Sequence, residues 1–171
     1  MCLTNIIERI REKLSEKLSN RKVPVSDGSR ILLRNATIDG SRLFIGKDVY
    51  IGPNATILCS ADDVVIGDHV VIGPGVTLVE SNHIYDNKRK YIKHSGLKRG
   101  GVKIENDCWL GANVTVLAGV TIGKGCVIGA CSCVTKSIPP YSVAVGIPAK
   151  VIKQRFTAEE IIEYEQNLNN R

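Results

Sequence analysis

Histidine is the side chain best suited to proton transfer near neutral pH, and this chain contains three of them. His69 falls in the segment IGDHVV and His94 among lysines, and both are expected to be ordinary exposed side chains. His83 follows directly after a predicted strand, at the start of a segment expected to be a loop. Loops held by rigid scaffolds often carry function, although His83 taken alone is also explained as a surface imidazole. Any chemistry at His83 therefore depends on the elements that position it.

Positive charge is the second chemical feature, and it is concentrated in one segment. The chain has 23 lysines and arginines against 17 acidic residues, which gives a formal net charge of +6. Residues 82–103 hold seven of these cations and one acid, Asp86, so this segment accounts for the whole net charge. A uniformly basic surface would favour a nucleic-acid partner. One basic loop on a neutral body instead favours either a local anionic ligand or a loop that simply extends into solvent. We expect no nucleic-acid partner, and both interpretations of the loop stay open.

Cysteine spacing and hydropathy bear on metals and on the compartment. Six cysteines occur without a CxxC pair, which disfavours a structural zinc site, and in a chain this long without a secretory signal they favour reduced core residues over a disulfide framework. No apolar stretch reaches the roughly 18 residues needed to cross a bilayer, and the pattern of a secretory signal is missing. We therefore expect a soluble, cytoplasmic protein with reduced thiols, no membrane span and no metal.

Aliphatic residues recur at every sixth position over long stretches of the chain. One such run is Ile104, Leu110, Val116, Ile122, Ile128 and Val134. A period of six fits neither an α-helix nor an alternating strand. It is typical of short strands joined by corners into a coil, with three sides and about 18 residues per turn. The pattern predicts an all-β solenoid.

Residues 18 apart should therefore pair on neighbouring parallel strands. Ile104 is expected under Ile122, and Leu110 under Ile128. The residue four places after each aliphatic position is usually small and is also expected to point inward. On this basis Cys108 is expected beneath Cys126 in the interior, near enough for a disulfide on distance alone, although the expected compartment favours free thiols.

The two ends of the chain follow a different pattern. Leucines and isoleucines at helical spacing among charged residues predict an amphipathic helix over residues 4–19. Thr157 and Glu160 match a capping box, which predicts a short acidic helix over residues 158–168. A solenoid has open ends with exposed edges, so either helix is expected to cover one of them.

The repeat also divides the chain into segments. Between Leu78 and Ile104 the aliphatic ladder is missing, which predicts a loop pushed out of the coil. The expected organisation is an N-terminal helical segment, the solenoid domain with its loop, and a C-terminal helix, over residues 1–30, 31–155 (loop 82–103) and 156–171.

The chain resembles the hexapeptide-repeat acyltransferases in the run DCWLGANVTVLAGVTIGKGCVIGACSCVTKSIPPYSVAVGIPAKVIKQR (residues 107–155), together with the upstream SNH. Within that family it is similar to the sugar O-acetyltransferases, such as the galactoside and maltose acetyltransferases and polysaccharide-modifying relatives. The resemblance implies a left-handed parallel β-helix, a hand that composition and spacing do not reveal. It also implies a homotrimer that transfers an acetyl group from acetyl-CoA to a sugar or saccharide precursor, in clefts between neighbouring subunits.

By position, His83 matches the catalytic base of this family. A neutral imidazole can take the proton of an acceptor hydroxyl as its oxygen attacks the thioester, and can return that proton to the departing thiolate. The resemblance implies acceptor contacts at four further residues: Asn54, Asn82, Tyr85 and Trp109. Asn54 is equally explained as a turn residue at a corner, and Trp109 as a packing residue between subunits.

The resemblance also implies which residues bind coenzyme A. Two small residues would let the pantetheine approach the backbone, and basic residues would face the phosphates of the nucleotide end. These positions are Ala112, Ala130, Thr135, Lys136, Lys150 and Lys153.

Alternative functions remain open. A γ-type carbonic anhydrase shares the fold and needs three histidine ligands, but the three histidines are 14 and 11 residues apart, which does not match. N-acetylation of an amino sugar, or a serine or xenobiotic acetyltransferase, would use the same coenzyme. A nonenzymatic β-helix scaffold is the alternative of a different class.

Overall fold

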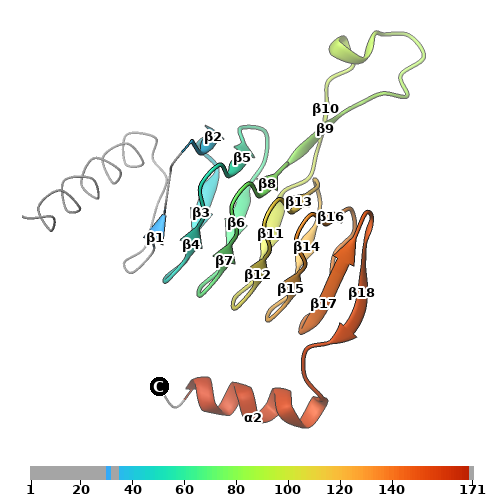
Figure 1. Cartoon of the computed structure of the whole chain (residues 1–171). Helices are drawn as coiled ribbons and strands as arrows, with labels where there is room; N and C mark the ends of the chain where they lie inside the picture. Colours follow the sequence, from blue (N-terminus) through green and yellow to red (C-terminus); the bar gives the residue numbers. More distant parts are fainter. Residues whose placement is uncertain (1–29, 32–34, 170–171) are drawn as a thin grey trace, which may run out of the picture.

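A three-sided coil of short strands makes up most of the chain, with one loop and one helix extending from it (Figure 1). The computed structural model describes residues 30–31 and 35–169. The helix predicted over residues 4–19, and almost all of the N-terminal segment 1–30, lie outside the described residues. Within those residues no helix is long and apolar enough to cross a membrane.

Three sheets form the sides of the coil, and each is named here after one of its strands. The β12 side has the order β1, β4, β7, β12, β15, β17 and β18: Arg30–Ile31, Tyr50–Ile51, Val71–Ile72, Trp109–Leu110, Val127–Ile128, Ser142–Gly146 and Ala149–Gln154. The β13 side has the order β16, β13, β8, β5 and β2: Cys133–Val134, Thr115–Val116, Thr77–Leu78, Thr56–Cys59 and Thr37–Gly40. The β11 side has the order β14, β11, β6 and β3: Thr121–Ile122, Val102–Ile104, Val64–Ile66 and Leu43–Ile45. Neighbours in these sheets pair in parallel, except β17 and β18.

Successive turns stack, so the corners between the sides also form rows along the coil. The helix corner leads from the β11 side to the β12 side, for example at residues 105–108 and 123–126. The alanine corner leads from the β12 side to the β13 side, at residues 111–114 and 129–132. The loop corner leads from the β13 side back to the β11 side, at residues 60–63, 79–101 and 117–120.

Two of these corners depend on residues with left-handed backbone angles, with φ between 51° and 71°. Such angles favour Gly, and Asn and Asp tolerate them better than most other residues do. At the alanine corner they belong to Asn54, Gly75, Asn113 and Cys131, and at the helix corner to Asp48, His69, Asp107, Gly125 and Tyr141. The recurring Gly, Asn and Asp of the repeat therefore set where the chain turns.

Strand register confirms the predicted spacing of 18 residues. Ile104 pairs with Ile122 and Leu110 with Ile128. Between β3 and β6, β4 and β7, and β5 and β8 the spacing is 21, as in the pair of Ile45 with Ile66. Three extra residues cause this difference, and they lie at the loop corner between β5 and β6.

Aliphatic side chains from every side fill the interior of the coil. The large residues of the ladder are buried throughout, and Ile104, Leu110 and Ile128 are at most 1% exposed. The smaller second set is buried as well, and it includes Cys108 and Cys126, as predicted. Both are free cysteines. One continuous hydrophobic core therefore runs along the coil.

Removing one rung of this ladder should destabilise the coil strongly. Leu110 is fully buried and pairs with Ile72 on one side and Ile128 on the other, so Leu110→Ala leaves a cavity that the stacked strands cannot fill. We expect a loss of about 2–5 kcal/mol in the free energy of unfolding, measured by urea denaturation at fixed protein concentration. Leu97→Ala is the matched control, because Leu97 is 45% exposed and lies outside the coil. Equal losses in the two variants would contradict a ladder in which the buried rungs carry the stability.

A loop leaves the coil after β8, as predicted, and returns at β11 (Figure 1). The predicted end at residue 103 is wrong, because Val102 and Lys103 already pair with β6 in the coil. Its base is an antiparallel pair, β9 (Ser81–His83) and β10 (Leu97–Arg99), and its outer part contains the short 3₁₀ helix η1 (Ile92–His94). β8 and β11 lie on consecutive sides of the coil, and Ile104 of β11 pairs with Ile66 of the preceding turn. The loop is therefore inserted at a corner and leaves the stacking of the coil undisturbed.

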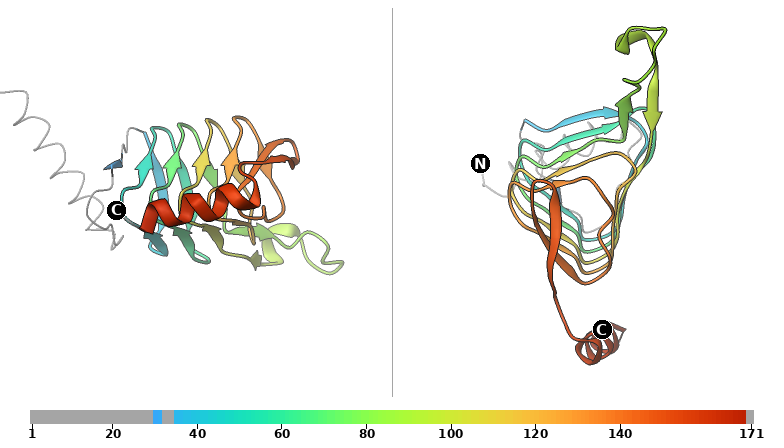
Figure 2. Two further views of the ribbon diagram at one scale, coloured as in Figure 1. Left: turned by 90° about the horizontal axis from the view of Figure 1, so that it is seen from below. Right: turned by 90° about the vertical axis from the view of Figure 1, so that its right-hand side faces the viewer.

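α2 (Ala158–Asn169) is the predicted C-terminal helix, and its capping box is present. Thr157 N donates to Glu160 Oε2 at 2.7 Å, and Glu160 N donates to Thr157 Oγ1 at 3.2 Å. The expectation that this helix covers an open end of the coil is wrong. α2 runs lengthwise along the outside of the coil (Figure 2), because its Tyr164 and Glu165 bond to residues of the helix corner.

Candidate active site

His83 is the last residue of β9, and its side chain is exposed. Its backbone is fixed, because it stands opposite Leu97 in the β9–β10 ladder and the next residue, Ile84, donates its N–H to Gly96 O at 3.1 Å. The imidazole is therefore open to solvent on a backbone tied to the coil. A bound substrate can reach such a group and exchange a proton with it.

The four residues expected to contact an acceptor fall into two groups. Asn82 and Tyr85 flank His83 on the loop, and Tyr85 is 80% exposed. Trp109 lies on the β12 side, 54% exposed, and Asn54 lies at the alanine corner with φ 59°. The chain thus brings Asn82 and Tyr85 together with His83. Asn54 and Trp109 lie on other faces of the coil. The left-handed backbone at the alanine corner is enough to explain why position 54 is an asparagine.

Residues expected to bind coenzyme A are also divided. Ala112 and Ala130 stack at the alanine corner, where Cys131 N donates to Ala112 O at 2.8 Å. A Cβ added at Gly111 would come within 2.7 Å of Ala130 N, so small residues keep the backbones of adjacent turns close at this corner. The remaining four lie elsewhere: Thr135 and Lys136 at the loop corner after β16, and Lys150 and Lys153 on β18.

One chain therefore presents two surfaces rather than one closed site. The loop corner carries His83, whereas the alanine corner carries Ala112 and Ala130. The width of the β13 side separates these two corners (Figure 2).

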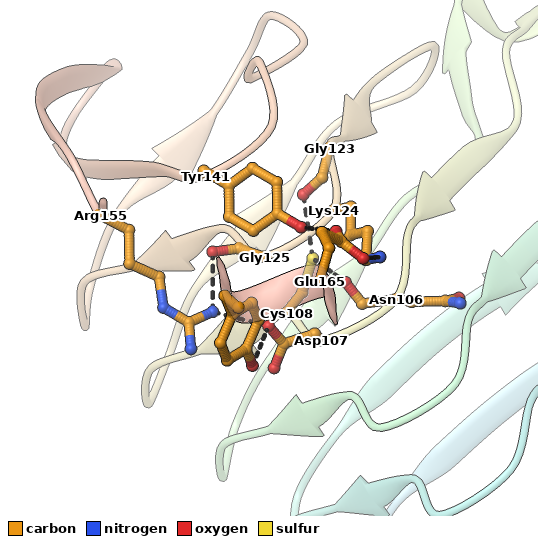
Figure 3. Close-up of polar contacts among 10 residues, drawn as sticks. Asn106, Asp107, Cys108, Gly123, Lys124, Gly125, Tyr141, Arg155 and Glu165 are labelled. Carbon is orange, nitrogen blue, oxygen red and sulfur yellow. Dashed lines mark hydrogen bonds and ion pairs between the residues drawn. The ribbon is translucent and has the colours of Figure 1, made fainter. Parts of the chain in front are cut away.

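The largest cluster of interacting titratable groups is elsewhere, where α2 meets the helix corner (Figure 3). Asp107 Oδ2 accepts hydrogen bonds from Arg155 Nη1 at 2.8 Å and from Tyr164 Oη at 2.9 Å. Glu165 Oε2 accepts from Lys124 Nζ at 2.5 Å. We name this cluster, with Tyr141, the helix clasp.

Burial and carboxylate partners together shift the pKa values in the helix clasp. Burial and a hydrogen bond to Glu165 raise the pKa of Tyr141, and burial and a hydrogen bond to Asp107 raise the pKa of Tyr164. The hydrogen bond from Lys124 lowers the pKa of Glu165. Perturbed pKa values often mark functional sites, but the groups of this cluster bond to one another across two elements of the chain. The helix clasp therefore fastens α2 to the coil.

Sequence reasoning missed Glu80, which directly precedes β9. Glu80 is 1% exposed, and its Oε1 accepts a hydrogen bond from Ala61 N at 2.9 Å. Its backbone oxygen accepts from Gly100 N at 2.9 Å, on the returning strand of the loop. The available signal was an acidic residue directly after the aliphatic run VTLV, at the point where the ladder stops. Glu80 anchors the root of the loop that carries His83.

The other two histidines are exposed, as predicted. His69 Nδ1 lies 3.0 Å from Asp48 Oδ2 on the neighbouring turn of the helix corner, and His94 ends η1. In the described part of the chain, no group of three or more His, Cys, Asp or Glu residues is placed to hold a metal ion.

The two interior cysteines should resist alkylation. Burial raises the pKa of the Cys108 thiol to about 12, and it also raises the pKa of Cys126. At pH 8 only about one Cys108 thiol in 10⁴ is then a thiolate, which is the reactive form. We expect iodoacetamide at pH 8 to leave both residues unmodified in the folded protein and to modify both in urea, as read by peptide mass spectrometry. Rapid modification of Cys108 in the folded protein would show that its thiol is neither buried nor protonated.

Comparisons with known proteins agree with this architecture. The family model for bacterial transferase hexapeptide repeats (six repeats) matches residues 43–79 and 101–136. The chain is 42% identical to the galactoside O-acetyltransferase of Escherichia coli (strain K12) over 117 residues, which cover 67% of this chain and 55% of that protein. The chain spans about half the length of the curated relatives it matches.

This chain covers a larger share of several solved structures, and they have the same fold. A maltose O-acetyltransferase from Clostridium difficile 630 superimposes with a TM-score of 0.75 at 30% identity, over 84% of this chain and 75% of that one. A hexapeptide-repeat acetyltransferase from Vibrio cholerae O1 biovar eltor, solved with acetyl-CoA, gives a TM-score of 0.74 at 27% identity, over 85% and 78% of the two chains.

The fold is thus a left-handed parallel β-helix built from hexapeptide repeats, which confirms the predicted class. The chain belongs to the hexapeptide-repeat acyltransferase family, and its likeness is to the sugar O-acetyltransferases of that family.

Proposed function

We propose that the chain transfers an acetyl group from acetyl-CoA to a hydroxyl of a sugar or saccharide precursor, with His83 as general base. The observation that supports this most directly is an exposed imidazole on a backbone fixed by the β9–β10 ladder, in a chain whose relatives include galactoside and maltose O-acetyltransferases. This activity fits the biosynthesis of a saccharide or polysaccharide in the cytoplasm, because acetyl-CoA is available there.

His83 handles one proton in the proposed reaction. Acetyl-CoA supplies a thioester, whose carbonyl carbon is the electrophile. His83 takes the proton of the acceptor hydroxyl as the hydroxyl oxygen bonds to that carbon, and the resulting imidazolium gives the proton to the sulfur when the C–S bond breaks. The products are the acetate ester and free coenzyme A. Such base assistance is typically worth about 10² to 10⁴ in rate.

The residues assigned to coenzyme A suit its two ends. At the alanine corner, Ala112 and Ala130 present little more than backbone, which a pantetheine chain can approach closely. Lys150 and Lys153 are exposed on β18, and no ion pair within residues 30–31 and 35–169 engages them. Their charges are thus available to the phosphates of the nucleotide end.

We propose that the working molecule is a homotrimer in which the loop corner of one chain faces the alanine corner of the next. The separation of His83 from Ala112 and Ala130 within one chain supports this arrangement, because a site that uses all three residues then needs two chains. Trp109, exposed on the β12 side, would line the same cleft or pack between subunits.

A thiol-release assay tests the proposal. Purified protein is incubated with acetyl-CoA and a panel of sugars, oligosaccharides and nucleotide sugars, with a thiol reagent to detect coenzyme A and mass spectrometry to identify the acetylated product. We expect acceptor-dependent thiol release and an O-acetyl ester. If products form only on amino sugars, serine or a xenobiotic, that class of compound is the acceptor instead of a sugar hydroxyl. If the protein shows neither turnover nor binding of acetyl-CoA, the result would favour the alternative that it is a nonenzymatic scaffold.

A further inference from the structure

Six cations on the loop have no acidic partner among the residues that the structure describes. We name these residues the basic arm: Lys88, Arg89, Lys90, Lys93, Lys98 and Arg99. All six are exposed, and none takes part in an ion pair among the described residues. Lys103, the seventh cation of the segment, differs because its Nζ lies 2.9 Å from Glu105 Oε1. The uncompensated charge is therefore spread over the loop, with four cations in its outer part and two, Lys98 and Arg99, on β10 at its base.

Local hydrogen bonds order this part of the chain although it buries none of its side chains. Arg89 N donates to Asn87 Oδ1 at 2.9 Å, and Ser95 Oγ donates to Tyr91 O at 2.9 Å. Tyr85 and Tyr91 are 80% and 84% exposed. Like charges held close together repel one another, so an ordered basic arm gains stability when an anion binds. Exposed tyrosines are typical of binding surfaces, because they offer an apolar face and a polar tip.

We propose that the basic arm binds the acceptor and selects acceptors that carry negative charge, as sugar carboxylates or as phosphates. This inference rests on the proposed acetyl transfer at His83. Within one chain the arm is continuous with His83, whereas Lys150 and Lys153, which are assigned to the nucleotide end of coenzyme A, are on β18 at the far end of the coil. These two lysines can neutralise the coenzyme phosphates without the arm, which leaves the arm's charge for the acceptor.

The length of the arm indicates the size of the acceptor. Four residues lie between His83 and Lys88, so their Cα atoms can be up to roughly 17 Å apart. At the full separation, an acceptor that contacts both residues must be longer than a monosaccharide, as an acidic oligosaccharide or a sugar joined to a diphosphate is.

The test compares matched acceptors in the wild-type protein and in a variant that lacks three of the arm's six cations. The triple variant Lys88→Gln, Arg89→Gln, Lys90→Gln is assayed with trigalacturonic acid against maltotriose, and with UDP-glucose against glucose. We expect kcat/KM for the preferred anionic acceptor to fall about 10- to 100-fold at low salt, and much less at 0.5 M salt, because screening weakens exposed charges. We expect kcat/KM for the neutral acceptor and the KM for acetyl-CoA to stay within about twofold of the wild-type values. The two acidic probes distinguish a carboxylate from a phosphate.

Lys47→Gln is the control, because Lys47 is an exposed cation at the helix corner, outside the proposed site. Equal losses for neutral and anionic acceptors, or a raised KM for acetyl-CoA, would overturn the proposal. Binding of the two acidic probes is measured separately by calorimetry, so failure of the arm is distinguishable from failure of the acetyl-transfer proposal. Wild-type protein that binds neither acidic probe, or a triple variant that binds them as tightly as wild type, would also overturn it.

Discussion

Replacing His83 with alanine is expected to lower kcat/KM for acetyl transfer by about 10² to 10⁴, while the protein remains folded. An alcohol is a weak nucleophile, and without a base its proton must leave to solvent during attack on the thioester. His83 is exposed and its side chain contributes nothing to the core, so its removal costs the coil little stability. The loss should therefore appear in turnover rather than in folding.

A matched pair of substitutions makes this measurement specific. His83→Asn and His69→Asn make the same chemical change at two exposed histidines, and asparagine tolerates the left-handed backbone of His69, with φ 58°. We expect the full loss for His83→Asn and near-wild-type turnover for His69→Asn, by thiol release, with circular dichroism as the check on folding. A folded His83→Ala protein with near-normal turnover would refute the assignment.

Mixing two inactive variants is expected to restore activity. His83→Ala removes the base, and Ala130→Phe fills the surface that coenzyme A would approach at the alanine corner. If each site takes His83 from one chain and Ala130 from its neighbour, random assembly of equal amounts in a symmetric trimer leaves about a quarter of the sites intact. Co-expressed variants should therefore reach roughly a quarter of wild-type activity per site, from nearly none for either variant alone.

The reciprocal mixture controls for the placement of the two substitutions. Wild-type chains co-expressed with chains carrying both substitutions should retain about a quarter of the activity if the site is shared, and about half if it lies within one chain. Light scattering establishes the number of subunits. No recovery in the first mixture, together with half the activity in the second, would place the complete site in a single chain.

The coil could be predicted from sequence because its repeat fixes both the spacing and the burial of the same residues. The pairing of Ile104 with Ile122 follows from one period and one assumption about the number of sides. The repeat slips between Ile57 and Ile66, but the sequence does not show which corner takes up the three extra residues, because they change no side chain that packs in the interior.

The position of α2 could not be predicted, although its residues and its cap could. A capping box is local to Thr157 and Glu160, whereas the docking of the helix depends on Tyr164 reaching Asp107, 57 residues earlier in the chain. The candidate site shows the same limit. Its residue types could be chosen from a resemblance, but their division between two corners depends on the path of the folded chain.

Insertions gather at the loop corner, and this has a consequence for how such a protein can diversify. The three extra residues before β6 and the whole loop before β11 lie on the same edge of the coil, and the strands after each insertion return to register. This edge can therefore be lengthened or exchanged as a module while the rest of the scaffold is kept. If the proposed function holds, grafting this loop between relatives should change acceptor preference without a change in the surface proposed for coenzyme A.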